Sequence, residues 1–233
     1  MGFAIASCAV LAAYNNLAGM LPWHRRRYTL LNLCATGAAL TAAAASGLTA
    51  TDIGVGRGEL RPGVRLGSAA AAAAAGGWVL IAAVPATRPI LSDDRIRGLS
   101  GREVAYQALV RIPLGTVLWE ETAFRGVLQA ALGRVMPGRA AIAVTSCIFG
   151  IWHVGPTAGA LRINGLAARG RILAGVTVGV AATAAGGVLL SGLRARSGSL
   201  AAPVLLHLAT NCTGPLVAFA VVRLTPAGPV PRG

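Results

Sequence analysis

Three groups of polar side chains interrupt stretches of the chain that are otherwise apolar enough to lie in lipid. They are Glu120, Glu121 and Arg125 in one stretch, Phe149 and His153 in a second, and His207 and Asn211 in a third. Ionisable side chains at membrane depth are costly, and they occur mainly where they carry out chemistry or move protons. The chain has only seven acidic residues and three histidines, so the placement of two of each in apolar stretches indicates a function rather than a need of folding.

The two adjacent carboxylates are expected to have different roles. On an α-helix, residues four apart share a face, so Glu121 can reach Arg125, whereas Glu120 points about 100° away from Glu121. The neighbouring cation is expected to keep Glu121 ionised. Glu120 is left to face a cavity, where a poorly hydrated carboxylate can accept a proton from water and later donate it to a leaving amine.

The imidazoles and the side-chain amide complete a set that could hydrolyse an amide bond. His153 could share the proton of Glu120 or hold the attacking water. His207 and Asn211 lie on one helical face and supply the donors that a tetrahedral oxyanion requires. The set therefore predicts peptide-bond hydrolysis with water as the nucleophile.

A metal site is an open alternative for the same groups. Two imidazoles and one carboxylate, here His153, His207 and Glu120, match a catalytic zinc site with an open position for water. These ligands would come from three helices, so their spacing does not decide the question in the way that a compact H-E-x-x-H motif does. The cofactor is therefore expected to be either none or zinc.

Composition places the chain among polytopic membrane proteins. Its 233 residues are 55% hydrophobic with a mean hydropathy of +0.67, well above the apolar content of a soluble domain. The net charge of +14 comes from arginine alone and lies mostly in short segments between apolar runs, a pattern typical of loops on anionic lipid. No soluble basic module is visible, which argues against a nucleic-acid partner.

Apolar runs of about 20 residues, each about 30 Å long as a helix, predict an all-α polytopic bundle of about seven transmembrane helices, within a range of about six to eight. The expected spans are 2–22, 28–50, 68–91, 113–133, 139–156, 172–192 and 200–223. Turn formers and charges predict that the segments 52–67, 92–111 and 155–171 connect spans. We expect one integral membrane domain over 1–233, a motif-bearing catalytic core over 113–211, and a flexible tail over 225–233, which is rich in proline and glycine.

The segment before the fourth span has its own pattern. The stretch 102–111 is amphipathic and is expected to lie along the membrane interface, with Pro113 in the first turn of the span. Glu120 then lies about 11 Å into the helix, immersed but not central. His207 enters from the opposite face and is expected about 8 Å deeper than Glu120, unless its helix is tilted or set lower.

The distribution of arginine predicts the orientation in a cell membrane. The first, third and fifth connecting segments, together with the tail, hold most of the arginines. The positive-inside rule then predicts an outside N-terminus and a cytoplasmic C-terminus. With that orientation, Glu120 and His153 lie at similar depth, in a site that faces the cytoplasm.

The ordered motifs Glu120-Glu121-x-x-x-Arg125, Phe149-x-x-x-His153 and His207-x-x-x-Asn211 resemble the CPBP intramembrane protease family. That family includes the CAAX prenyl endopeptidases and bacterial proteins linked to abortive infection and to bacteriocin self-immunity. The stretch 197–207 is similar to the family's approach to its third motif, and the resemblance covers about 120–211.

The resemblance implies a role for each motif residue. Glu120 would activate the water with assistance from His153. His207 and Asn211 would form the oxyanion site, and Glu121 with its paired arginine would support them. The family is commonly described as metalloproteases, although a glutamate mechanism without metal has also been proposed for it, and we favour the glutamate mechanism.

The sequence therefore predicts an intramembrane endopeptidase that cleaves a peptide bond near the membrane surface. Its expected partners are membrane lipid and a membrane-associated peptide or protein substrate. The alternative is a non-catalytic membrane protein, either a transporter or a bacteriocin or phage immunity factor, that uses the same polar cluster for binding.

Overall fold

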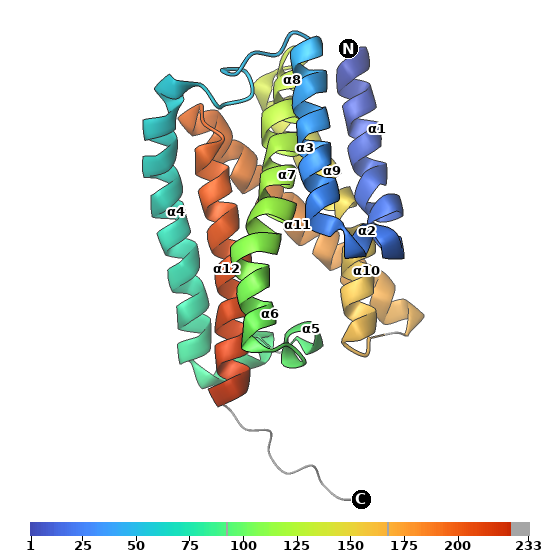
Figure 1. Ribbon diagram of the computed structural model, residues 1–233, viewed down its shortest axis with the longest axis vertical. Coiled ribbons are helices and arrows are strands. Elements are labelled where there is room, and N and C mark those ends of the chain that lie inside the picture. Colours follow the sequence, from blue (N-terminus) through green and yellow to red (C-terminus); the bar gives the residue numbers. More distant parts are fainter. Residues whose placement is uncertain (92, 167, 225–233) are drawn as a thin grey trace, which may run out of the picture.

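The computed structural model describes residues 1–91, 93–166 and 168–224, and every described element is helical (Figure 1). The longer helices are α1 (Gly2–Leu17), α3 (Tyr28–Ala45), α4 (Arg57–Ala83), α9 (Gly138–Trp152), α10 (Val154–Ile163), α11 (Arg169–Ser197) and α12 (Ala201–Leu224). Short elements connect them: η1 (Ala18–Met20), α2 (Pro22–Arg26), η2 (Pro85–Leu91) and α5 (Asp94–Arg97). The predicted all-α bundle is confirmed, and the tail expected over 225–233 lies outside the described residues.

A continuous helical run over residues 101–133, here called the central run, carries the first motif. It consists of α6 (Gly101–Tyr106), η3 (Gln107–Val117), α7 (Leu118–Glu121), η4 (Thr122–Leu128) and α8 (Gln129–Gly133), and η3 and η4 are wound as π-helix. π-helical turns are rare and are found frequently at functional sites. Here two of them flank the pair of glutamates on α7.

Six helical segments of the described chain are long and apolar enough to cross a membrane. They are Gly2–Met20, Tyr28–Ala45, Arg57–Ala83, Gly138–Ile163, Gly170–Ser197 and Ala201–Arg223. The central run is not one of the six, because it carries the charged glutamates and arginine of the first motif. With the central run included, the chain passes the bundle seven times, and α1 begins at the end opposite to the one where α12 ends (Figure 1).

The expected interface segment before the fourth span is instead part of the central run. The run begins at Gly101, where Ser100 and Glu103 form a reciprocal capping box, and it continues through 102–111 without a break. Pro113 lies inside the π-helix η3 and not in a first turn. Pro113 has no N–H group to donate within the helix, and the wider π-helical turn accommodates it. Prolines are common where a helix is locally distorted. Glu120 therefore lies well inside a long helix rather than two turns after its beginning.

Two segments expected to be connections are largely helical. α4 begins at Arg57 and runs through Gly58, Pro62, Gly63 and Gly67 of the segment 52–67. The reason is close packing, since a Cβ atom on Gly67 would lie 2.8 Å from Cα of Ala202 on α12. Similarly, α10 occupies the first half of 155–171 and follows a break at His153, where the expected span 139–156 divides into two helices.

Aromatic side chains pack the central run against α1 and α9. Trp119 and Phe124 of the run and Phe149 and Trp152 of α9 are each at most 4% exposed. The rings of Phe124 and Phe149 meet edge to face with centroids 5.0 Å apart, a favourable geometry for aromatic pairs. This packing fixes the helix that carries His153 beside the two glutamates.

Candidate active site

Glu121 joins the first and third motifs. Its Oε1 atom accepts a hydrogen bond from Nη1 of Arg125 at 3.0 Å and another from Nδ1 of His207 at 2.6 Å. The Glu121 and Arg125 side chains are completely buried, and that of His207 is nearly so. Hydrogen bonds between charged groups are stronger than neutral ones, so Glu121 fixes the rotamer of each partner.

Arg125 is held on its other side by Phe149. The guanidinium carbon lies 4.0 Å from the centre of the Phe149 ring, a cation–π geometry. Phe149 therefore contributes to the site by covering the buried cation as well as by packing. Nη1 binds Glu121, whereas Nε and Nη2 have no hydrogen-bond partner among the described residues.

Glu120 has one oxygen bonded and one free. The indole N–H of Trp152 donates to Oε1 at 3.0 Å. Oε2 is buried, has no hydrogen-bond partner among the described residues, and lies 3.9 Å from Nε2 of His207. Glu120 also lines a cavity of about 440 Å³. The two glutamates therefore have different surroundings, since Glu121 is paired with Arg125 whereas Glu120 lines a cavity.

His207 and Asn211 lie at the same depth as the glutamates. Nδ2 of Asn211 is 2.9 Å from Nε2 of His207, one turn apart on α12. The expected depth difference of His207 is wrong, because Nδ1 of His207 is in direct contact with Glu121. The error came from starting the helix of Glu120 at Pro113, whereas the central run begins at Gly101.

His153 occupies the break between α9 and α10. Its Nδ1 lies 2.8 Å from the carbonyl oxygen of Phe149, so Nδ1 carries the proton that is donated to this carbonyl. In the neutral ring, Nε2 then keeps its lone pair as an acceptor. The rings of His153 and Phe149 meet at 72° with centroids 4.7 Å apart, edge to face rather than stacked. His153 lines the same cavity as Glu120.

Two asparagines of α1 hold this helix break. Nδ2 of Asn16 donates to the carbonyl oxygen of Ile151 at 2.7 Å, and Oδ1 of Asn16 accepts from the backbone N–H of Gly155 at 2.8 Å. Nδ2 of Asn15 donates to the carbonyl oxygen of Trp152 at 3.2 Å. The motifs do not include these two residues, and their only signal in the sequence is an adjacent pair of amides within an apolar helix.

Two adjoining cavities reach the motif residues from one end of the bundle. The first, of about 440 Å³, is lined by Glu120 and His153, and the second, of about 480 Å³, is lined by Asn211. Both cavities are lined by Arg95, Arg111 and Thr116. The site is therefore accessible from the end that carries α2, α5 and α10, and its approach is rich in arginine.

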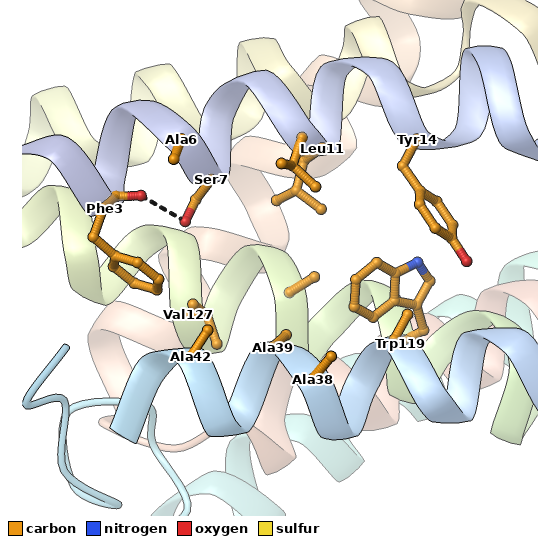
Figure 2. Close-up of a pocket in the computed structure, with 13 residues that line it drawn as sticks. Phe3, Ala6, Ser7, Leu11, Tyr14, Ala38, Ala39, Ala42, Trp119 and Val127 are labelled. Atoms are coloured by element: carbon orange, nitrogen blue, oxygen red, sulfur yellow. Dashed lines mark hydrogen bonds between the residues drawn. The ribbon is translucent and has the colours of Figure 1, made fainter. Parts of the chain in front are cut away.

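An aromatic wall separates Glu120 from an apolar groove between α1 and α3. Tyr14 stacks on Trp152 with centroids 5.7 Å apart and planes 6° apart. Figure 2 shows Tyr14 and Trp119 at one end of the groove, which has a volume of about 300 Å³ and is otherwise lined mainly by small and aliphatic side chains. The wall thus keeps the apolar groove apart from the polar cavity.

Tyr14 is anchored by a buried polar chain that the sequence did not predict. Its hydroxyl lies 3.1 Å from Nε2 of His24 and donates to Oδ1 of Asn32 at 3.0 Å. Nδ2 of Asn32 donates to the carbonyl oxygen of Gly115, in the π-helix η3, at 2.7 Å. His24 is only 2% exposed, so it is a buried part of this chain of hydrogen bonds.

The groups considered for zinc are not arranged as a ligand set. Among the described residues, no three histidine, cysteine, aspartate or glutamate side chains are placed to hold one metal ion. Nδ1 of His207 binds Glu121 and Nδ1 of His153 binds a backbone carbonyl, so only Nε2 of each ring could bind a metal. The trio Glu120, His153 and His207 is not clustered as a zinc site in this geometry, and we derive no step through a metal.

Comparison with known proteins agrees with this site. A family model described as type II CAAX prenyl endopeptidase Rce1-like matches residues 103–213, a segment that contains all the motif residues. No curated protein and no solved structure matched the chain in the other two comparisons. Over the segment 103–213, the chain is therefore similar to the type II CAAX prenyl endopeptidases.

Proposed function

We propose that the protein is an intramembrane endopeptidase in which Glu120 activates a water molecule to attack a peptide carbonyl. The observation that carries the proposal is the position of Glu120 Oε2, which is free of hydrogen bonds and lies 3.9 Å from Nε2 of His207. A carboxylate oxygen without a partner, beside an imidazole of another helix and on a residue that lines a cavity, has the features required of a general base.

The first step uses Glu120 and His153. Oε2 of Glu120 takes one proton from the water, and the acceptor Nε2 of His153 orients the water through its second hydrogen. The water oxygen then bonds to the carbonyl carbon, and the carbonyl oxygen becomes an oxyanion. The hydrogen bond from Trp152 to Oε1 keeps the carboxylate of Glu120 directed toward the cavity.

The second step uses His207 and Asn211. The amide N–H of Asn211 and Nε2–H of His207 are the proposed oxyanion donors. Nδ1 of His207 donates to Glu121, so in the neutral ring Nε2 accepts from Nδ2 of Asn211 at 2.9 Å. For His207 to donate to the oxyanion, Nε2 must gain a proton and the Asn211 amide must turn from Nε2 toward the oxyanion. When the tetrahedral intermediate collapses, the C–N bond breaks and Glu120 returns its proton to the leaving amine.

We further propose that the site faces the cytoplasm. The cavities open at the end of the bundle that carries α2, α5 and α10, and the arginine-containing segments 23–27, 93–111, 155–166 and 168–171 lie there. An excess of arginine marks the cytoplasmic side of membrane proteins. The substrate is then a membrane-associated peptide or protein that is reached from that side.

The test compares Glu120→Gln with Glu103→Gln, a matched change on the same helical run. Glutamine at 120 keeps an acceptor for Trp152, and glutamine at 103 still suits a capping box, so both variants should fold. New peptide termini, measured by proteomics of membranes from expressing cells, should disappear with Glu120→Gln and persist with Glu103→Gln. Cleavage that continues unchanged in Glu120→Gln would contradict the role of Glu120. A cellular protection phenotype that persists in both variants without cleavage would favour the non-catalytic alternative.

A further inference from the structure

A second polar cavity, of about 410 Å³, lies at the end of the bundle opposite to the proposed substrate entrance. It is lined by residues from the turn before α4, from η4 and α8, and from the ends of α9 and α11 that meet there. α8 marks this end in Figure 1. The cavity shares no lining residue with the two cavities beside Glu120, Asn211 and His153. It is therefore a separate site.

Three of the side chains that line this cavity carry buried polar atoms without a hydrogen-bond partner among the described residues. Arg125 lines it with a side chain that is 0% exposed, and Nε and Nη2 of this guanidinium have no hydrogen-bond partner among the described residues. Oε1 of Gln129 and Nε of Arg194, which also line the cavity, are likewise buried without a partner there. Buried polar atoms are nearly always hydrogen-bonded, so three side chains with unmet partners around one cavity point to a ligand.

The charge around the cavity selects an anion. Three arginines line it, Arg125, Arg139 and Arg194. The one lining carboxylate, Asp52, is already bonded to the backbone N–H of Thr49 at 2.8 Å and to Arg134 at 3.0 Å. Guanidinium groups bind phosphate and carboxylate oxygens through paired N–H donors. Arg125 is paired with Glu121, so the three arginines face two carboxylates, and the charge that remains around the cavity is still positive.

The acceptor of Gln129 refines the class of anion. Its Nε2 donates to the carbonyl oxygen of Ser191 at 3.3 Å, which leaves Oε1 to receive a donor. A ligand that satisfies the whole cavity has anionic oxygens for the arginines and a hydroxyl for Oε1. Hydrogen phosphate and the phosphoglycerol headgroup of an anionic lipid both have this chemistry.

We infer that this cavity binds a phosphate-type anion that carries a hydroxyl group, with Arg125, Arg139 and Arg194 as its cationic ligands and Gln129 as its acceptor. Arg125 then contacts two partners at once: Glu121 of the active site through Nη1, and the anion through the remaining nitrogens. The inference concerns binding and does not depend on whether Glu120 is catalytic.

The test measures binding of inorganic phosphate to the full chain in detergent by calorimetry, at constant ionic strength set with chloride. Arg139 is exposed, so Arg139→Gln should fold. Arg196→Gln is the matched control, since Arg196 is an exposed arginine of α11 outside the cavity. Loss of one charge-assisted contact should weaken phosphate binding about tenfold or more in Arg139→Gln and leave Arg196→Gln unchanged. Absence of saturable binding, or equal binding by both variants, would overturn the inference.

A second arm distinguishes the source of the anion. The protein in nanodiscs of phosphatidylglycerol or phosphatidylcholine is released into the gas phase, and the retained lipids are counted by mass spectrometry. Retention of phosphatidylglycerol that falls in Arg139→Gln and is displaced by phosphate supports a lipid headgroup. Phosphate binding that depends on Arg139, with lipid retention equal in all variants, supports the free ion.

Discussion

Nδ1 of His207 and Oε1 of Glu121 lie 2.6 Å apart, although 86 positions of the chain separate the two residues. This hydrogen bond joins the central run to α12 and passes through the same oxygen that binds Arg125. Glu121 is therefore both the electrostatic partner of a buried cation and the residue that orients an imidazole. The first prediction tests this double role.

Glu121→Gln should destabilise the protein strongly, whereas Glu120→Gln should not. The first change removes the negative charge beside Arg125, which is completely buried, and leaving a buried cation unpaired costs about 3–5 kcal/mol. Thermal unfolding in detergent, followed by circular dichroism, compares the two variants with the parent protein. An unfolding temperature of Glu121→Gln equal to that of the parent would show that Arg125 does not depend on this carboxylate.

Trp152→Phe should lower activity while keeping the fold. Phenylalanine retains an aromatic ring in the core but removes the N–H donor to Oε1 of Glu120. A hydrogen bond to a charged group contributes about 1.5–3 kcal/mol, so kcat/KM should fall between about 10-fold and 100-fold.

Trp119→Phe is the control for this prediction. Trp119 is also buried in the aromatic wall, but its indole nitrogen has no hydrogen-bond partner among the described residues. Replacing Trp119 should change the packing of the core but keep the hydrogen bond from Trp152 to Glu120. Equal losses of kcat/KM in the two variants would argue that Trp152 acts through packing alone.

Gly67→Ala and Gly76→Ala should change stability in opposite directions, although both glycines lie on α4. A Cβ at position 67 would lie 2.8 Å from Cα of Ala202, so α4 and α12 must separate, at a cost of about 1–3 kcal/mol. A Cβ at position 76 meets no atom within 4 Å, and alanine is preferred over glycine in a helix by about 1 kcal/mol. Unfolding temperatures of the two variants give the comparison, and similar values would contradict the close contact at Gly67.

The stability of the protein should decrease when the pH falls below about 6.5, in part because of His24. Burial lowers the pKa of His24, which lies between the first two spans. The unfolded chain then binds a proton at a higher pH than the folded chain does. The contribution of neutral His24 to the stability of the fold is therefore complete above the pKa that His24 has in the unfolded chain. It is lost as the pH falls toward the lower pKa that His24 has in the folded chain.

His24→Gln should reduce this pH dependence. The measurement is the difference in unfolding temperature between about pH 8 and about pH 5, taken for the parent and the variant. The other two histidines are present in both proteins, so the change in the difference isolates His24. A pH dependence that is identical in the parent and in His24→Gln would contradict the proposed effect of burial.

The sequence by itself determined the class of the protein and its chemical groups. Apolar runs of membrane-spanning length predict helices, because lipid requires every backbone group to bond within its own segment. Helical periodicity alone separated the roles of Glu120 and Glu121, since adjacent residues point in different directions. The motif spacing was also sufficient to predict the family that the match over 103–213 confirms.

The sequence predicts the beginnings of α4 and of the central run less well, because glycine and proline occur both in turns and in closely packed or distorted helices. Glycine and proline at 62–67 were interpreted as turn formers, whereas at Gly67 the absence of a side chain allows α12 to approach. The same residue type serves both purposes, and only the neighbouring helix distinguishes them. The start of the central run was placed at Pro113 for a similar reason, since the π-helix that accommodates this proline has no clear local signal.

Only the tertiary structure decided which polar groups meet. Trp152, Asn15 and Asn16 contact or position the motif residues through bonds between helices that are distant in the chain. His207 lies beside Glu121 because the packing of α12 sets its depth, and no spacing within one helix contains that information. Covalent sequence determines which face of a helix a residue occupies, but the relative depth and rotation of two helices follow from the packing of all the side chains between them.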